Sequence, residues 1–406
     1  MLLISNDRVC DTVSRRGPIR IQDFALPSRL ASPMKLAPSM TVRLSSRKRR
    51  WMTLAALFLG LLTAEGVLRF FLFSGTAFAA EHGQGFRQAS LFTPGASDAD
   101  YWKLMYRFAP QAHKQATSNF DPELGWIKGA IDPTSYVHDD MADLGQRRPV
   151  LVYGASFASG VNSNTLSLEG LMRDSDRGER YALINYGVGG YGVDQMLLLY
   201  RKTIHLFNGL DPIVVFAPVV ESDLDRAMVD FLSRPKPQFA WRRGQLHLDA
   251  DLSSSSEEFL AEREVGISSF LWRYMLHGTD VPRVEWLMTK AGESSRRDRQ
   301  RVLVAGILKA IDSEARTHAH DFCFLLFHAQ EWIAAEDGTS WQERHLVKNL
   351  QALEHRWVDT RPQLLRLARD EPSGLAAAYF QAGPGRNHLS DLGVKACFQA
   401  LAVSLP

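Results

Sequence analysis

Two residues far apart in the sequence are of the types needed for nucleophilic catalysis. Ser156 ends the short apolar run RPVLVYGAS, and His388 lies near the end of the chain in GRNHLSDLG. A serine hydroxyl is a weak nucleophile unless a neighbouring imidazole accepts its proton. If the fold brings the two side chains together, the pair can attack an acyl carbonyl, with Ser156 as nucleophile and His388 as base.

Two further segments between these residues could stabilise the negative charge that such an attack creates. NYGVGGYG contains Asn185 and Gly190, and VVESD contains Ser222 and Asp223. A tetrahedral intermediate needs preorganised hydrogen-bond donors, and a residue without Cβ lets the backbone approach a substrate closely. We expect the backbone N–H groups of Ser156 and Gly190 to be donors, with the Ser222 hydroxyl as a third. Asn185 and Asp223 complete the candidate binding residues.

The surrounding sequence alternates between predicted strands and predicted helices. Such alternation is typical of parallel βαβ units and predicts a three-layer α/β/α sandwich, in which ligands bind beyond the carboxyl ends of the strands. The chemistry-bearing segments above follow predicted strands, so we expect them to share one crevice. The predicted strands are 148–156, 181–192, 211–223 and 321–330, and the predicted helices are 165–173, 194–207, 269–278, 296–318, 340–356 and 393–405.

The order of these segments resembles that of the SGNH (GDSL-like) hydrolase superfamily. Its blocks GDS, N-x-G-x-x-G, G-x-N-D and D-x-x-H correspond here to YGASFASG, NYGVGGYGVDQ, VVESDLDR and GRNHLSDLG. FDPELGW, upstream of them, is similar to the lead-in of membrane-anchored bacterial members. The resemblance covers roughly 149–225 and the last twenty-odd residues. It implies a flavodoxin-like sheet and ester chemistry, with Ser156 as nucleophile, Gly190 as the second-block glycine and His388 as base.

Three positions depart from the family pattern. Ala155 replaces the Asp of GDS, Ser222 stands where the oxyanion Asn is expected, and Gly385 replaces the Asp that orients the histidine. A Ser-His dyad remains an active arrangement, because the oxyanion hole and substrate binding act independently of the orienting carboxylate. Asp391, Asn387 or a backbone carbonyl are alternatives for orienting the histidine. A decayed site that binds glycan or scaffolds an envelope complex without turnover is the alternative function.

Two competing motifs are less consistent with the sequence. Gly187, Gly189 and Gly192 satisfy G-x-G-x-x-G, but the next acidic residue at a strand end, Glu221, is thirty-four positions beyond Gly187, too far for a ribose contact. The α/β-hydrolase elbow G-x-S-x-G lacks its second glycine here. His328, after its predicted strand, is the one rival to His388 as base.

The N-terminal region has the charge and hydropathy of an export signal. A basic run, 47–50, precedes the apolar stretch 51–64, which Gly66 to Phe73 extends to the ~20 residues of a membrane span if Glu65 and Arg69 are tolerated. These two residues are spaced i,i+4 and could pair. We expect a single-pass anchor in the cell inner membrane, with the catalytic domain in the periplasm.

Processing of this segment has alternatives. Ala77-Phe78-Ala79 is an A-x-A sequence at which a signal peptide could be cleaved, and Arg49-Arg50 permits a twin-arginine signal. An uncleaved anchor is the preferred interpretation.

Composition excludes other classes of function. Residues 1–50 hold eleven Lys and Arg against three Asp and Glu, so the remainder is mildly acidic and nucleic acid is not an expected partner. The three cysteines show no zinc-type spacing, and we expect neither metal nor cofactor. The expected substrate is an ester, on an acetylated carbohydrate or a lipid, resolved by hydrolysis or by O-acyl transfer. The predicted organisation is a disordered segment at 1–46, an anchor at 47–80, a lead-in at 81–145, and a catalytic domain at 146–406 with an insertion at about 226–295.

Overall fold

The computed structural model describes residues 45–109, 119–161, 163–249, 252, 255–279, 282–335, 338–383 and 385–406, with only the backbone given for 282–294. The disorder expected for 1–46 lies outside the described residues except at its last two positions. The chain divides into two compact units, 1–57 and 58–406, and every element described below except the first part of helix α1 (Ser46–Phe73) belongs to the second.

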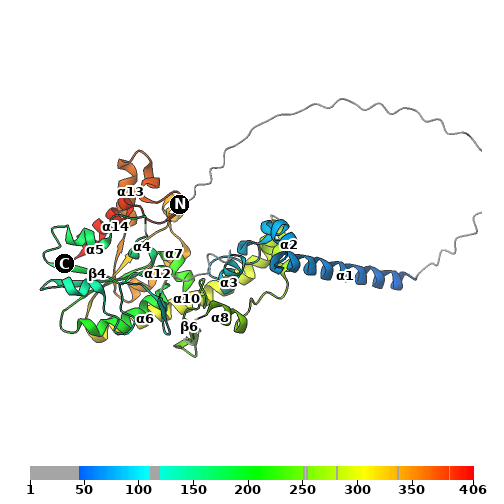
Figure 1. The fold of residues 1–406 in the computed structure, drawn as a ribbon, viewed down its shortest axis with the longest axis horizontal. Coiled ribbons are helices and arrows are strands. Elements are labelled where there is room, and N and C mark those ends of the chain that lie inside the picture. Colours follow the sequence, from blue (N-terminus) through cyan, green and yellow to red (C-terminus); the bar gives the residue numbers. More distant parts are fainter. Residues whose placement is uncertain are drawn as a thin grey trace, which may run out of the picture. The chain divides into compact units, whose positions relative to one another are not determined.

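A five-stranded parallel sheet forms the centre of this unit (Figure 1). Its strand order is β4-β3-β5-β8-β9, which is 2-1-3-4-5 when its own strands are numbered along the chain. This is the flavodoxin-like order, so the predicted fold class is confirmed. The central strands are apolar throughout because helices cover both of their faces. The strands are β3 (Arg148–Gly154), β4 (Tyr181–Asn185), β5 (Ile213–Ala217), β8 (Asp321–Leu326) and β9 (Arg356–Asp359).

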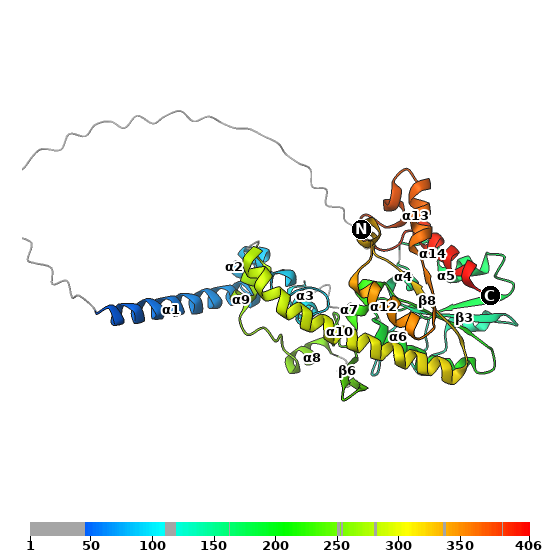
Figure 2. The same ribbon diagram turned by 180° about the vertical axis from the view of Figure 1, so that it is seen from behind.

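Helices pack on the two faces of the sheet and bury two separate apolar clusters (Figures 1 and 2). One face carries α6 (Val193–Thr203), α10 (Pro282–His318) and α12 (Trp341–Ala352). The other carries α5 (Leu168–Arg173), α13 (Arg361–Asp370) and α14 (Asp391–Ser404). Cys323 and Cys397 are free and buried within the second cluster, as expected of small apolar side chains.

The predicted third strand was too long. β5 ends at Ala217, and the polar triplet at 221–223 lies in helix α7 (Val220–Arg226). Pro218 has no N–H to give to the ladder, and only one isolated bridge, between Val219 and Phe327, follows it before the helix begins. The chain then turns, and the Asp223 carboxylate accepts a hydrogen bond from the Val219 N–H at 2.8 Å.

Strand β9 and helix α13 were not predicted from the sequence. The helix expected at 340–356 ends at Ala352, and Arg356 already belongs to β9. β9 is four residues long, lies at the edge of the sheet and is half polar, so it lacks the apolar run that marks the central strands.

An excursion between β5 and β8 carries further elements. It contains the antiparallel hairpin of β6 (Gln238–Arg242) and β7 (Gln245–Asp249), then α8 (Ser256–Glu262) and α9 (Phe270–His277). A fully buried ion pair joins it to the core, because Lys236 Nζ lies 2.5 Å from Asp194 Oδ2 at the start of α6. Such a pair, once one partner is removed, leaves an uncompensated buried charge.

The chain before β3 begins with a long apolar helix, α1 (Ser46–Phe73), the one described helix that is long and apolar enough to cross a membrane. Short elements connect it to the sheet: α2 (Ala77–His82), η1 (Gln84–Phe86), η2 (Ala89–Leu91), α3 (Ala99–Phe108), β1 (Asn119–Asp121), β2 (Gly125–Ile127) and η4 (Asp139–Asp143). The remaining short helices are α4 (Ser156–Ser159), η5 (Ile204–Phe207), α11 (Gln330–Ala334) and η6 (Gly374–Ala378).

Candidate active site

Ser156 begins the short helix α4 directly beyond the carboxyl end of β3. The turn requires the glycine that ends the strand, because a Cβ on Gly154 would lie 2.5 Å from the Cβ of Ala158 and 2.8 Å from the Ala217 carbonyl oxygen. The Ser156 side chain is half-buried, so it remains open to a substrate.

His388 reaches Ser156 from a loop near the C-terminus. Its Nε2 atom lies 3.0 Å from Ser156 Oγ, within hydrogen-bond distance. The loop is closed by paired backbone bonds, in which Phe380 N–H donates to the His388 carbonyl and Asn387 N–H donates to the Phe380 carbonyl. The Phe157 ring lies 5.7 Å from the imidazole between centroids. The fold therefore brings the two predicted residues together.

A backbone carbonyl orients the imidazole. His388 Nδ1 lies 3.3 Å from the Arg386 carbonyl oxygen, which can only accept a hydrogen bond, so the proton of the neutral ring belongs on Nδ1. Nε2 then presents its lone pair to the Ser156 hydroxyl, as a general base must. Arg386 was not singled out from the sequence, because a main-chain carbonyl leaves no signal in residue type.

The two side chains proposed as substitutes for the missing carboxylate lie elsewhere. Asp391 accepts hydrogen bonds from the Asn164 side chain and from Thr165 and Leu166 N–H. Asn387 has a φ of 66°, a conformation that Asn adopts more readily than most residues, and contributes to the turn that presents His388.

The glycine loop after β4 packs directly beside the nucleophile turn. Val188 N–H donates to the Gly154 carbonyl at 3.0 Å, and a Cβ on Gly187 would lie 2.7 Å from Ser159 N. Gly190 has a φ of +86°, a conformation suited to glycine. The indole of Trp126, from the FDPELGW segment, donates to the Gly189 carbonyl at 3.0 Å and fixes the loop from the other side.

Asn185 joins this loop to the nucleophile helix. Its Nδ2 donates to the Ala158 carbonyl at 2.8 Å and to Glu169 Oε2 at 3.0 Å, and its Oδ1 accepts from Gly187 N–H at 3.0 Å. Both ends of the amide are engaged within the protein. In this structure Asn185 therefore positions the loop rather than reaching toward a ligand.

Ser222 and Asp223 lie in the first turn of α7. The Ser222 hydroxyl donates to Asp223 Oδ1 at 3.0 Å, so its one proton is already used, and a donor role toward substrate requires the hydroxyl to rotate. Arg226 Nη1 also bonds Asp223 Oδ1, at 2.6 Å, and lies 3.5 Å from the Tyr191 carbonyl oxygen of the glycine loop. Asp223 is fully buried, and this burial raises its pKa to about 6 despite the neighbouring guanidinium.

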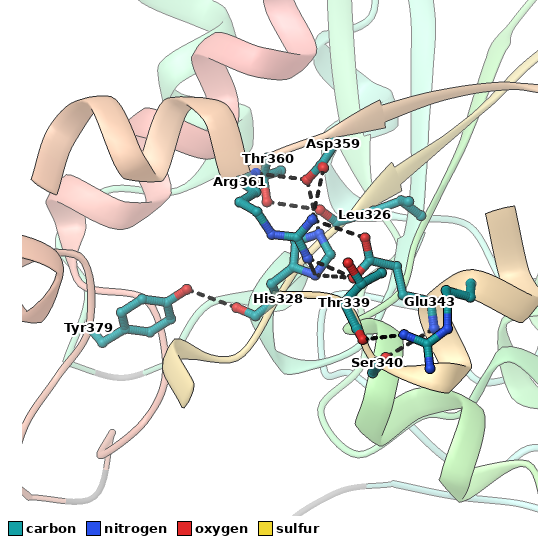
Figure 3. Close-up of polar contacts among 10 residues, drawn as sticks. Leu326, His328, Thr339, Ser340, Glu343, Asp359, Thr360, Arg361 and Tyr379 are labelled. Atoms are coloured by element: carbon teal, nitrogen blue, oxygen red, sulfur yellow. Dashed lines mark hydrogen bonds and ion pairs between the residues drawn. The ribbon is translucent and has the colours of Figure 1, made fainter. Parts of the chain in front are cut away.

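His328, the rival base, belongs to a separate polar network beyond β8 (Figure 3). Its Nε2 lies 2.9 Å from Asp359 Oδ1 and its Nδ1 lies 3.2 Å from Arg361 Nη2. Because a carboxylate accepts and a guanidinium donates, the ring carries its proton on Nε2 and accepts on Nδ1. No lone pair is left for a substrate hydroxyl, so His328 is not arranged as a base.

This network supports the loop of His388. Figure 3 shows the Tyr379 hydroxyl directed at the His328 main-chain carbonyl, to which it donates at 2.8 Å. Tyr379 pairs with Leu389, next to His388, in an isolated antiparallel bridge. Tyr379 is thus a positioning residue that was missed from the sequence, since its contact joins segments 51 residues apart.

The same network contains a group of residues with metal-ligand chemistry. Glu221, His328 and Glu343 each place one ligand atom within 4.8 Å of the others, and all three are buried. Arg361 already binds two of these three residues, since its guanidinium donates to both Glu343 oxygens at 2.6 and 3.0 Å and to His328. The arrangement is therefore better described as an ion network in which arginine is the cation.

No family model matches the sequence, and no curated protein matches it. Solved structures similar to this chain include the acetyl xylan esterase AlAXEase, with a TM-score of 0.34, 12% identity, and coverage of 64% of this chain and 100% of that one. Another is Axe2, an acetylxylan esterase from Geobacillus stearothermophilus, with a TM-score of 0.35, 12% identity, and coverage of 64% and 95%. A third is the lipase/acylhydrolase from Enterococcus faecalis, with a TM-score of 0.33, 13% identity, and coverage of 63% and 94%. At this level of identity and structural similarity, the activities named above belong to those proteins alone. The chemistry of this chain is argued from its own residues.

Proposed function

We propose that this chain is a serine esterase that acts through an acyl-enzyme formed on Ser156. One observation supports it above all. His388 Nε2 lies 3.0 Å from Ser156 Oγ while Nδ1 faces a carbonyl, so the imidazole has the tautomer that a base needs. The dyad lies beyond the carboxyl ends of parallel strands, where ligands bind in this class of fold.

The reaction follows from this geometry. Ser156 Oγ attacks the ester carbonyl carbon, and its proton passes to His388 Nε2. The resulting oxyanion accepts hydrogen bonds from the N–H groups of Ser156 and Gly190, and Gly190 N–H donates to no other group among the described residues. The tetrahedral intermediate collapses, the bond to the alkoxide breaks, and the leaving oxygen takes the proton from Nε2. A water molecule then attacks the acyl group, gives a proton to Nε2, and releases the acid as the proton returns to Ser156.

The same intermediate serves hydrolysis and transfer. If a sugar hydroxyl rather than water attacks the acyl-enzyme, the chain is an O-acyltransferase. We propose an acetylated carbohydrate or a lipid ester as substrate, because both are found outside the cytoplasmic membrane where the N-terminal helix would hold the domain.

We also propose that α1 is an uncleaved anchor that places the domain in the periplasm. Ala79 of the A-x-A sequence is fully buried in α2, whose first turn is capped by the Thr76 hydroxyl. Cleavage after Ala79 would also remove Leu68 and Leu72, which pack in an apolar cluster of the folded domain. Mass spectrometry of the protein from membranes is expected to find α1 retained, and a mature N-terminus at Ala80 would contradict the proposal.

The full chain in detergent should hydrolyse p-nitrophenyl acetate and be labelled by a fluorophosphonate probe. Ser156→Ala should abolish labelling and lower kcat by at least about 10³-fold. Ser159→Ala, three residues along the same short helix, is the matched control and should stay labelled. A folded wild-type protein that neither turns over nor labels would contradict the esterase proposal.

That result would favour the alternative, a glycan-binding module. A cavity of about 680 Å³ favours this second candidate, since it is lined by the half-exposed Trp241 of β6 and by the polar Asp298 and Arg299 of α10. This alternative would be supported if the Ser156→Ala variant binds oligosaccharides and the Trp241→Ala variant does not.

A further inference from the structure

The charge-free part of helix α1 is too short to span a bilayer by itself. Its uninterrupted apolar stretch, 51–64, is fourteen residues, or about 21 Å at the rise of an α-helix, whereas the hydrocarbon core is about 30 Å thick. The span cannot extend toward the N-terminus, because 47–50 are four consecutive cations. The missing length must come from the other end, and a twenty-residue span that starts at Trp51 ends at Phe70.

Two charged residues, Glu65 and Arg69, fall within this span, and the fold neutralises both. Arg69 Nε donates to Glu65 at 2.6 Å and Arg69 Nη2 donates to the Ser268 carbonyl at 2.9 Å. The Glu65 carboxylate also accepts from the N–H groups of Phe270 and Leu271 at 3.0 and 2.8 Å. Charges that pair with one another or with backbone groups are the kind tolerated at membrane depth.

These bonds fix the depth of α9. Because Glu65 binds the N–H groups of its first turn, α9 starts at the level of Glu65, inside the twenty-residue span. Helix α2 folds back beside Phe71, one residue beyond this span, since the Phe78 and Phe71 rings lie 6.0 Å apart between centroids. Figure 2 shows α2 and α9 gathered around the end of α1.

The outward faces of these elements are largely apolar, although Glu81 and His82 at the end of α2 are also exposed. Leu68 and Leu72 are buried against the domain, whereas five apolar side chains of α1, α2 and α9 face outward, with Phe78 57% and Trp272 45% exposed. Aromatic side chains are typical of the boundary between lipid and water. We name this set the collar: Val67, Phe70, Phe73, Phe78 and Trp272.

We infer that the collar is embedded in the interfacial layer of the bilayer leaflet in which α1 ends, so that α2 and α9 contact lipid. This inference rests on the proposed anchor and extends it, because the domain is then held against the membrane rather than on a free tether. The occupant of the surface is lipid acyl chain and headgroup, continuous with the lipid around 51–64.

The test uses the full chain, with Cys10→Ser, in vesicles of phosphatidylcholine and phosphatidylglycerol. Nitroxide labels are placed on Phe78→Cys and Trp272→Cys, on Leu57→Cys within the span, and on Val403→Cys, which is 78% exposed and serves as the aqueous control. The collar labels are expected to lose most of the collisional broadening by a water-soluble nickel chelate seen at position 403 and to gain broadening by oxygen. If the labels at 78 and 272 are as accessible to the chelate as the label at 403 while the label at 57 is in lipid, the proposed anchor is supported and the proposed lipid contact of the collar is contradicted. If the 57 label is also aqueous, both fail.

Discussion

His388 Nε2 and Ser156 Oγ lie 3.0 Å apart although 232 positions separate the two residues in the chain. The contact is made possible by the parallel sheet, which brings the end of β3 and the loop after η6 to the same edge. The imidazole is oriented by the Arg386 carbonyl, so the dyad needs no third side chain. The predictions below test this arrangement and the groups that support it.

The two candidate bases are distinguished by a matched pair of substitutions. His388→Gln should abolish fluorophosphonate labelling, because Ser156 then has no base. His328→Gln should keep labelling but lower the free energy of unfolding by about 1–3 kcal/mol, since it disrupts the hydrogen bonds of a buried imidazole to Asp359 and Arg361. Denaturant unfolding and gel-based labelling measure the two effects, and loss of labelling only in His328→Gln would reverse the assignment.

The glycine loop offers a pair of adjacent positions with different constraints. A Cβ on Gly190 would lie 3.0 Å from Leu232 and 3.3 Å from Trp126, at a φ of +86°, whereas a Cβ on Gly189 meets nothing within 4 Å. Gly190→Ala should therefore displace an oxyanion donor and lower kcat by about ten- to hundredfold. Gly189→Ala is the control and should remain near wild type. Steady-state kinetics with p-nitrophenyl acetate measure kcat for both variants. Equal effects of the two substitutions would contradict the assignment of Gly190 as an oxyanion donor.

An aspartate introduced at position 385 should not create a catalytic triad. A Cβ on Gly385 would already lie 3.2 to 3.3 Å from Phe380, Ser163 and Val161, so a carboxylate there is both crowded and poorly solvated. Gly385→Asp is expected to lower Tm without raising kcat, and Gly385→Ala separates crowding from charge. A higher kcat with an unchanged Tm would contradict this prediction and would mean that a carboxylate at position 385 can assist His388.

Asp223 should make stability depend on pH. Burial raises its pKa to about 6, above the ~3.9 of the unfolded chain, so the folded state binds this proton more tightly. The resulting stabilisation is present at low pH and is lost as pH rises through 6. Relative to Asp223→Asn, the wild-type protein should gain about 1 kcal/mol of unfolding free energy between pH 7 and pH 5. Urea unfolding of both proteins measures the difference, and a constant difference across this range would contradict the raised pKa.

The sequence determined the fold class and singled out Ser156 and His388 as the candidate pair. Alternating apolar runs and helical segments are local patterns, and they predicted strands β3, β4, β5 and β8 and the parallel sandwich. The types and order of Ser156, Gly190 and His388 predicted the chemistry. Few residue types can act as a nucleophile or as a base, and only glycine lets the backbone approach a substrate so closely.

Tertiary structure alone decided how these residues are held. The Arg386 carbonyl, the Tyr379 hydroxyl and the Trp126 indole act through contacts between distant segments, which no local pattern records. The sequence placed Ser222 at a strand end, because the apolar run continues through Val219 and Val220 although β5 ends at Ala217 and α7 begins at Val220. Only the structure shows that Asp359 and Arg361 engage both ring nitrogens of His328. Whether a ring nitrogen has a free lone pair depends on its partners in space and not on residue type.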